Sequence, residues 1–225
     1  MKTSTVLKNL SIVSAGATSI ALATMGTASA SIIFDGGGPD QQDGNEMTQW
    51  VQTEDFILSQ DIGTRLTDVH FWTFEDPGAW DGTLDYFVFA NAGGQPAGTP
   101  FAQGAGANVV KTATGNQTFG LNEYAYSFDL QTPLDLSANT TYWLGLHLSS
   151  NFDRDEIYWS WSTTTPGVGS TGQESFGGTF NNWSNNGQHH AFYLTGQKVP
   201  EPASVLGLLA IGALGAGAAL KRKLK

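Results

Sequence analysis

The sequence predicts an all-β fold, a jelly-roll-like antiparallel β-sandwich, for most of this 225-residue chain. Apolar residues recur at every second position in several segments, for example at Tyr124, Tyr126, Phe128 and Leu130. Such a row is one face of a half-buried strand. Clusters of Gly, Pro, Asn and Asp separate these segments, and no part of the body shows the longer period of an amphipathic helix.

Nine segments between residues 31 and 197 have the composition and spacing of short strands. No internal repeat is visible, so their even distribution favours a sandwich over a solenoid. The expected strands cover residues 31–34, 49–58, 66–75, 83–90, 108–113, 124–130, 142–148, 157–161 and 190–195.

The first 30 residues are expected to be a secretory signal peptide rather than part of the fold. Lys2 and Lys8 precede an apolar run of small residues, and Ala28 and Ala30 form an Ala-x-Ala cleavage site. Cleavage after Ala30 leaves a body that begins at Ser31. The expected partners of this segment are the secretion machinery and signal peptidase.

The C-terminal segment, residues 198–225, has the order expected of a membrane anchor. Pro200, Glu201 and Pro202 precede an uncharged stretch at 203–220 and a basic tail. An 18-residue helix rises about 27 Å, close to the ~30 Å hydrocarbon core of a bilayer. We expect a transmembrane helix at about 203–220, with the basic tail on the cytoplasmic side of the inner membrane.

This order of motif, helix and basic tail resembles the PEP-CTERM sorting signal, a segment also called the ice-binding protein C-terminal domain. The resemblance implies that an exosortase-like sorting enzyme in the membrane cuts near Pro200-Glu201-Pro202. Two prolines suit that role because they hold Glu201 in extended backbone. The resemblance covers only the tail and implies no activity for the body, which has no regular threonine array suited to ice.

The body, residues 31–197, is expected to be one strongly acidic domain. Nineteen Asp and Glu residues stand against Arg65, Lys111 and Arg154, a formal balance of −16. This charge argues against nucleic acid as a partner, because phosphate backbones recruit Lys and Arg. The absence of cysteine excludes disulfides and thiolate metal sites.

Two tryptophan-bearing loops are the candidate glycan contacts. Trp80 lies between a Pro-Gly turn pair and the Asp81-Gly82 turn pair, and Trp183 follows Asn182 in an Asn-rich loop. An aromatic ring matches the C–H face of a sugar, while carboxylates and amides bind its hydroxyls. The alternative is that both tryptophans fill the core or plug their loops.

A cluster of acids near the start of the body raises the question of a structural calcium ion. Asp35, Asp40 and Asp43 lie close together beside permissive glycines, and carboxylate oxygens are the ligands that Ca²⁺ prefers. The spacing matches no EF-hand, and a solvated acidic loop is the competing interpretation. No other cofactor is indicated.

No residue pattern in the body diagnoses a reaction, so the chain is not expected to be an enzyme. It lacks the His-Glu-x-x-His motif of zinc proteases and the Gly-x-Ser-x-Gly elbow of hydrolases. Three functions stay open: an envelope or matrix protein with little ligand chemistry, a module that binds extracellular polysaccharide, and a glycoside-processing enzyme. The expected location is a membrane-anchored precursor and then the cell surface or extracellular matrix.

Overall fold

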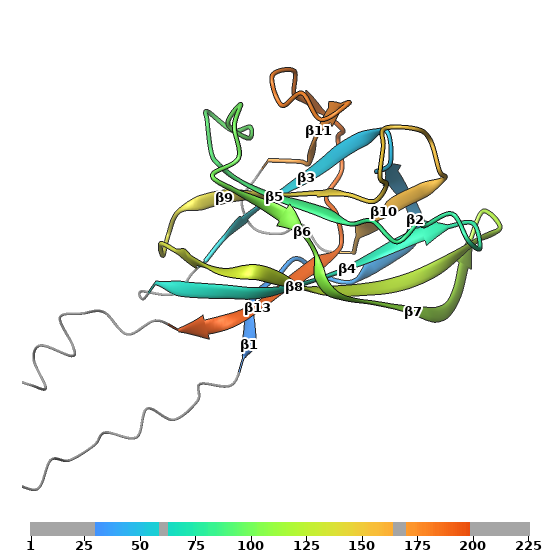
Figure 1. The fold of residues 1–225 in the computed structure, drawn as a ribbon, viewed down its shortest axis with the longest axis horizontal. Coiled ribbons are helices and arrows are strands. Elements are labelled where there is room, and N and C mark those ends of the chain that lie inside the picture. Colours follow the sequence, from blue (N-terminus) through green and yellow to red (C-terminus); the bar gives the residue numbers. More distant parts are fainter. Residues whose placement is uncertain (1–29, 59–62, 164–169, 199–225) are drawn as a thin grey trace, which may run out of the picture.

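The computed structural model describes residues 30–58, 63–163 and 170–198, which are all-β as the sequence predicts. Their strands form two antiparallel sheets that pack as the two layers of a β-sandwich (Figure 1). No helix in these residues is long and apolar enough to span a bilayer.

The larger sheet, sheet A, has seven strands arranged around β4. Five run in spatial order, and β8 pairs with both β4 and β7. The bounds of the strands in sheet A are β1 (Ser31–Asp35), β13 (Phe192–Lys198), β4 (Thr64–Glu75), β10 (Ile157–Ser162), β2 (Pro39–Glu46), β8 (Leu121–Leu136) and β7 (Ala107–Thr118).

The smaller sheet, sheet B, has six strands and lies above sheet A in Figure 1. Its central strand β3 carries the polar residues of a buried network described below. In spatial order the strands are β12 (Ser184–Asn185), β11 (Gln173–Phe176), β3 (Trp50–Ile57), β9 (Thr141–His147), β5 (Asp85–Ala90) and β6 (Ala102–Ala105).

All nine expected strands are present, but the described residues contain four more. These are β2, β6, β11 and β12. The segment that forms β2, Pro39–Glu46, contains no large apolar residue, because it is an edge strand whose side chains are partly or fully exposed. The β7–β8 hairpin is also longer than expected, because its pairing continues through the polar residues up to Thr118 and Leu121.

The core lies between the two sheets and is filled largely by aromatic rings. Val69 and Phe71 of β4 belong to the same buried cluster as Phe56 of β3, Leu146 of β9 and Trp159 of β10. Burying aromatic side chains of this size contributes about 2 to 3 kcal/mol each, which suits a fold without disulfides.

Candidate functional site

The outer face of sheet A carries side chains from alternate positions of β4. Val69 and Phe71 point into the core. Because successive residues of a strand face opposite sides, His70, Trp72 and Phe74 point away from sheet B, although Phe74 is buried and only 1% exposed. This outer row is the starting point for a candidate binding surface.

Three rings form what we call the aromatic platform on this face: His70, Trp72 and Tyr193. Tyr193 of β13 lies opposite His70 in register, and their rings stack at 4.2 Å between centroids and 6° between planes. The Trp72 ring lies 5.9 Å from that of Tyr193. All three side chains are partly exposed, so the platform offers ring surface to solvent.

A shallow hollow of about 120 Å³, the platform hollow, adjoins these rings. Val110 and Thr112 of β7 and Ala125 and Ser127 of β8 line it together with the platform. Ser127 pairs with His70 and Ala125 with Trp72, so small side chains keep the rings uncovered on that side. The side chain of Val110 is 55% exposed and adds an apolar rim.

Acidic side chains surround the platform. Burial lowers the pKa of His70, while Asp68 and Asp129 oppose that shift. Burial also raises the pKa of the Tyr193 hydroxyl, and Asp35 adds to the effect. His70 is therefore neutral near pH 7, and the platform combines uncharged rings with a rim of hydroxyl-accepting carboxylates.

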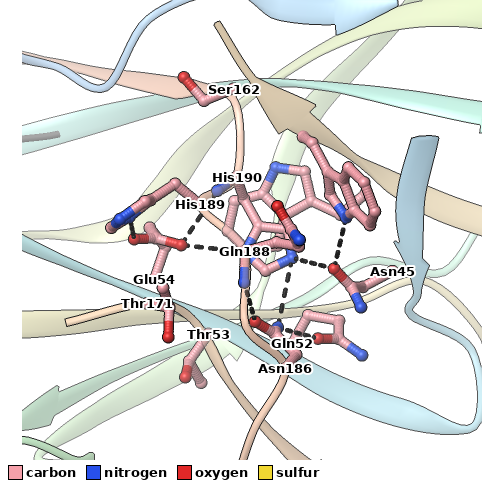
Figure 2. A network of polar contacts seen from close by, with 12 residues as sticks. Asn45, Gln52, Thr53, Glu54, Ser162, Thr171, Asn186, Gln188, His189 and His190 are labelled. Atoms are coloured by element: carbon pink, nitrogen blue, oxygen red, sulfur yellow. Dashed lines mark hydrogen bonds and ion pairs between the residues drawn. The ribbon is translucent and has the colours of Figure 1, made fainter. Parts of the chain in front are cut away.

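A second polar constellation is buried around Glu54 of β3 (Figure 2). Glu54 is fully buried, and its two carboxylate oxygens bind different histidines. Oε1 lies 2.8 Å from Nδ1 of His189, and Oε2 accepts from the His190 backbone N–H at 3.0 Å. Nδ1 of His190 also lies 3.0 Å from Oε2. The carboxylate thus joins sheet B to the segment that leads into β13.

Amide side chains complete this network. Nε2 of His190 lies 3.1 Å from Oδ1 of Asn45, which also accepts from the indole of Trp161 at 2.7 Å. Asn186 donates to Gln52 at 3.0 Å. His189 and His190 already satisfy the hydrogen-bonding capacity of the Glu54 carboxylate. Glu54 therefore acts as a structural bridge between the sheets.

The hydrogen bond to Glu54 raises the pKa of His189, although burial opposes the shift. A raised histidine pKa means that the folded state holds a proton more tightly than the unfolded chain. The stability from this pair is therefore present below pH 6.5 and is lost as the pH rises through the raised pKa.

Asp55 is buried on the opposite face of β3 and is the most strongly perturbed carboxyl described. Burial raises its pKa from 3.8 to about 7, and the neighbouring Glu54 adds to the shift. Its Oδ1 atom is buried without a hydrogen-bond partner. A neutral Asp55 avoids placing an unpaired buried charge beside the Glu54 carboxylate.

A third buried carboxylate, Glu75 at the end of β4, is also satisfied within the protein. Lys111 lies 2.7 Å from its Oε2, while Tyr126 and Thr73 donate to Oε1. Lys111 also lies 4.0 Å from the ring centre of Tyr124. This ion pair joins β7 to β4 within sheet A, across the intervening strand β8.

The structure places Trp80 against the core. Its indole N–H donates to the Thr83 carbonyl at 2.7 Å, and its ring meets the Tyr126 ring edge-on at 5.3 Å. Asp81 is exposed and accepts from the backbone N–H groups of Thr83 and Ser150, each at 2.8 Å. Both residues thus shape the loop that contains them.

Trp183 lies elsewhere, on the outer face of sheet B. Its ring packs against Phe89 at 5.3 Å and stacks on Phe180 at 5.9 Å. Its indole nitrogen is buried without a hydrogen-bond partner, and the neighbouring Asn182 is exposed. The two tryptophan loops are therefore not brought into one site, and a role in ligand contact stays a prediction for each.

The three acids considered for calcium each accept a hydrogen bond from a backbone N–H one or two residues further along the chain. Oδ1 of Asp35, Asp40 and Asp43 accepts from the backbone N–H of Gly37, Gln42 and Gly44, respectively. In the described ranges, no group of three or more His, Asp or Glu side chains is arranged to hold a metal ion. Calcium binding by these acids stays untested.

The predicted targeting segments fall almost entirely outside the described residues. Ala28 of the cleavage site, the motif Pro200-Glu201-Pro202 and the expected helix at 203–220 all lie there. Ala30 is the first described residue and is exposed. Ser31 pairs with Gly196, so the described domain starts and ends at one edge of sheet A.

Comparison with known proteins identifies the tail but not the body. Residues 198–223 match the PEP-CTERM protein-sorting motif, as the sequence resemblance indicated. No curated protein matches the chain. The motif marks an exported protein whose membrane-anchored precursor is sorted by exosortase, and its match begins at the last residue of β13.

The aromatic platform was not anticipated from the sequence, although its signal is present there. Asp68, His70, Trp72 and Phe74 alternate with Val69 and other core residues along one strand. Period-two alternation alone does not say which row faces the core when both rows are aromatic. The structure shows that the row of Val69 and Phe71 faces the core. The pairing of β4 with β13 then sets Tyr193 beside His70 on the outer face.

Replacing Asp55 with asparagine should flatten part of the pH dependence of stability. The folded wild type keeps a proton up to about pH 7 that the unfolded chain loses near 3.8, so rising pH destabilises it over that interval. The asparagine side chain does not titrate. We expect the variant to gain up to about 4 kcal/mol relative to the wild type between these limits. Urea unfolding at several pH values measures this difference, and parallel pH profiles would contradict it.

Proposed function

We propose that this chain is an exported protein of the cell surface or extracellular matrix that binds a neutral glycan on the aromatic platform. One observation carries the proposal: Trp72, Tyr193 and His70 offer ring surface on an open sheet face. Aromatic faces pack against the C–H surfaces of sugars, and neighbouring carboxylates and hydroxyls orient the sugar hydroxyl groups.

The charge of the body supports a neutral rather than an anionic glycan. The body carries a formal charge of −16, and Asp35, Asp68 and Asp129 act electrostatically on the platform rings. Like charges repel an acidic polysaccharide and slow its approach. A neutral chain meets no such barrier and gains the carboxylates as hydrogen-bond acceptors.

The contacts of the buried acids support a protein that binds the glycan without cleaving it. Glycoside hydrolysis needs two carboxyl groups free to act on the bond between sugars. The carboxylates of Glu54, Glu75 and Glu123 are instead engaged by protein donors. The competing proposal, a matrix protein with little ligand chemistry, keeps the same sorting signal but needs no role for the platform.

Affinity gel electrophoresis tests the glycan proposal. Gels would contain hydroxyethyl cellulose, β-glucan, xylan or galactomannan, and an alginate gel would provide the anionic comparison. We expect at least one neutral gel to retard the wild type, while W72A and Y193A migrate as in a gel without polysaccharide. Losing one hot-spot aromatic contact costs about 2 kcal/mol or more.

Two controls sharpen this test. Trp183→Ala removes a tryptophan from the outer face of sheet B and should retain binding. Purified wild-type protein should release no reducing ends from the retarding polysaccharide, whereas release would favour the enzyme alternative. Unchanged retardation of W72A and Y193A, or no retardation of the wild type in any gel, would reject the platform as the binding site.

The sorting signal has its own test. Replacing Pro200 and Pro202 with Ala should leave an uncut, membrane-held precursor, because the extended strip around Glu201 is then free to join a helix. Immunoblots of membrane and released fractions distinguish precursor from product. Normal processing of the double variant would show that sorting does not need the two prolines of the motif.

A further inference from the structure

The hairpin between β7 and β8 places an aromatic side chain where turn geometry disfavours it. Thr118 pairs with Leu121, so Phe119 and Gly120 are the two residues of the turn. Their φ angles are +53° and +85°. Two positive φ angles define the turn type that prefers Asn-Gly, and a bulky residue in this region of backbone space is an outlier.

The exposure of the Phe119 ring also lowers the stability of the fold. Its side chain is 80% exposed, the highest value among the large apolar residues of the described chain. The backbone conformation and the exposed ring both oppose stability, and Asn at this position would avoid both costs. A strained and exposed aromatic residue points to a contact with something outside the fold.

Phe119 is one of the residues that line a hollow of about 240 Å³, which we call the hairpin hollow. Phe74 of β4 and Tyr158 of β10 lie opposite each other in register and both line it. The remaining lining residues, from β2 and the hairpin, are Asp43, Gly44, Thr118 and Leu121. Because Phe74 is only 1% exposed, a ring-sized group entering this hollow would meet mainly Phe119, Tyr158 and Asp43.

The hairpin hollow lies on the same face of sheet A as the platform, but a polar bridge crosses β4 at Phe74. Gln41 of β2 donates to Glu123 of β8, which pairs with Phe74, and Thr118 donates to the Gln41 carbonyl at 3.2 Å. Phe74 follows Trp72 on the same outer face, and four residues of strand from His70 to Phe74 cover about 13 Å. That distance is longer than one sugar ring. Beside this path, Asn116 donates to the buried Glu123 at 3.1 Å, so side-chain amide groups flank the line between the two hollows.

We infer that the ligand of the platform is a linear neutral polysaccharide that runs over the outer face of sheet A and across the Gln41–Glu123 bridge, with one sugar on the platform and a later one beside Phe119. This inference rests on the proposed function, which it extends. Two hollows aligned along one strand suit a chain rather than a single sugar or a chain end. The acidic rim, with Asp43 in the hairpin hollow, again favours an uncharged chain.

The test compares F119N with the wild type on oligosaccharides of increasing length, prepared by partial hydrolysis of the neutral polysaccharide that retards the wild type. Calorimetric titration of the full chain gives each affinity. Phe176→Asn is the matched control, because Phe176 is another exposed phenylalanine, 55% exposed and packed on Trp50 in sheet B.

For the wild type we expect affinity to rise with chain length until the oligosaccharide spans both hollows. F119N should bind the shortest ligands like the wild type and the longest about thirtyfold more weakly, as expected for one lost hot-spot aromatic contact. F176N should match the wild type at every length. F119N should melt at the same temperature as the wild type or higher, because Asn suits the turn.

Each other outcome would contradict a defined part of this inference. If F119N binds long chains like the wild type while W72A binds none, the platform stands and the hairpin hollow is no subsite. If W72A also binds like the wild type, the proposed function itself fails. A clear drop in the melting temperature of F119N would show that the ring packs within the fold, which contradicts its assignment to a ligand.

Discussion

Strand β4 is the constraint on which the rest of the structure depends. It pairs with β13 and β10 along one edge and with β8 along the other, so it sets the register of sheet A. Its inward row, including Val69 and Phe71, belongs to the core. Because the side-chain period is two, a slip by one residue would bury the outward row and expose the core. The hydrophobic core therefore also determines where the platform faces.

Buried carboxylates connect this core to its periphery. Glu54 bridges sheet B to the segment before β13, and the pair of Glu75 and Lys111 joins β4 to β7 within sheet A. Removing one partner of such a pair costs about 3 to 5 kcal/mol, because it leaves a buried charge unpaired. The loops and edge strands that frame the outer face of sheet A are thus positioned by polar contacts as well as by packing. That rigidity suits a surface that binds without rearranging.

Much of the fold could be predicted from alternation, but the candidate site could not. Nine strands were visible because their apolar rows have period two, whereas β2 was hidden because Pro39–Glu46 is an edge strand without large apolar residues. Trp80 and Trp183 attracted attention as aromatic residues in turn-rich loops, yet each packs onto its own sheet. Trp72 and Tyr193 are 121 positions apart, and only sheet pairing brings them together.

Oxidative footprinting of the full chain tests the central claim, that the outer face of sheet A is the binding surface. Hydroxyl radicals modify exposed aromatic side chains, and mass spectrometry measures each residue with and without the neutral polysaccharide. The account predicts protection of Trp72, Tyr193 and Phe119, with Trp183 and Phe176 unchanged. Protection confined to Trp80 or Trp183, or no protection of Trp72 under conditions where the polysaccharide is bound, would contradict it.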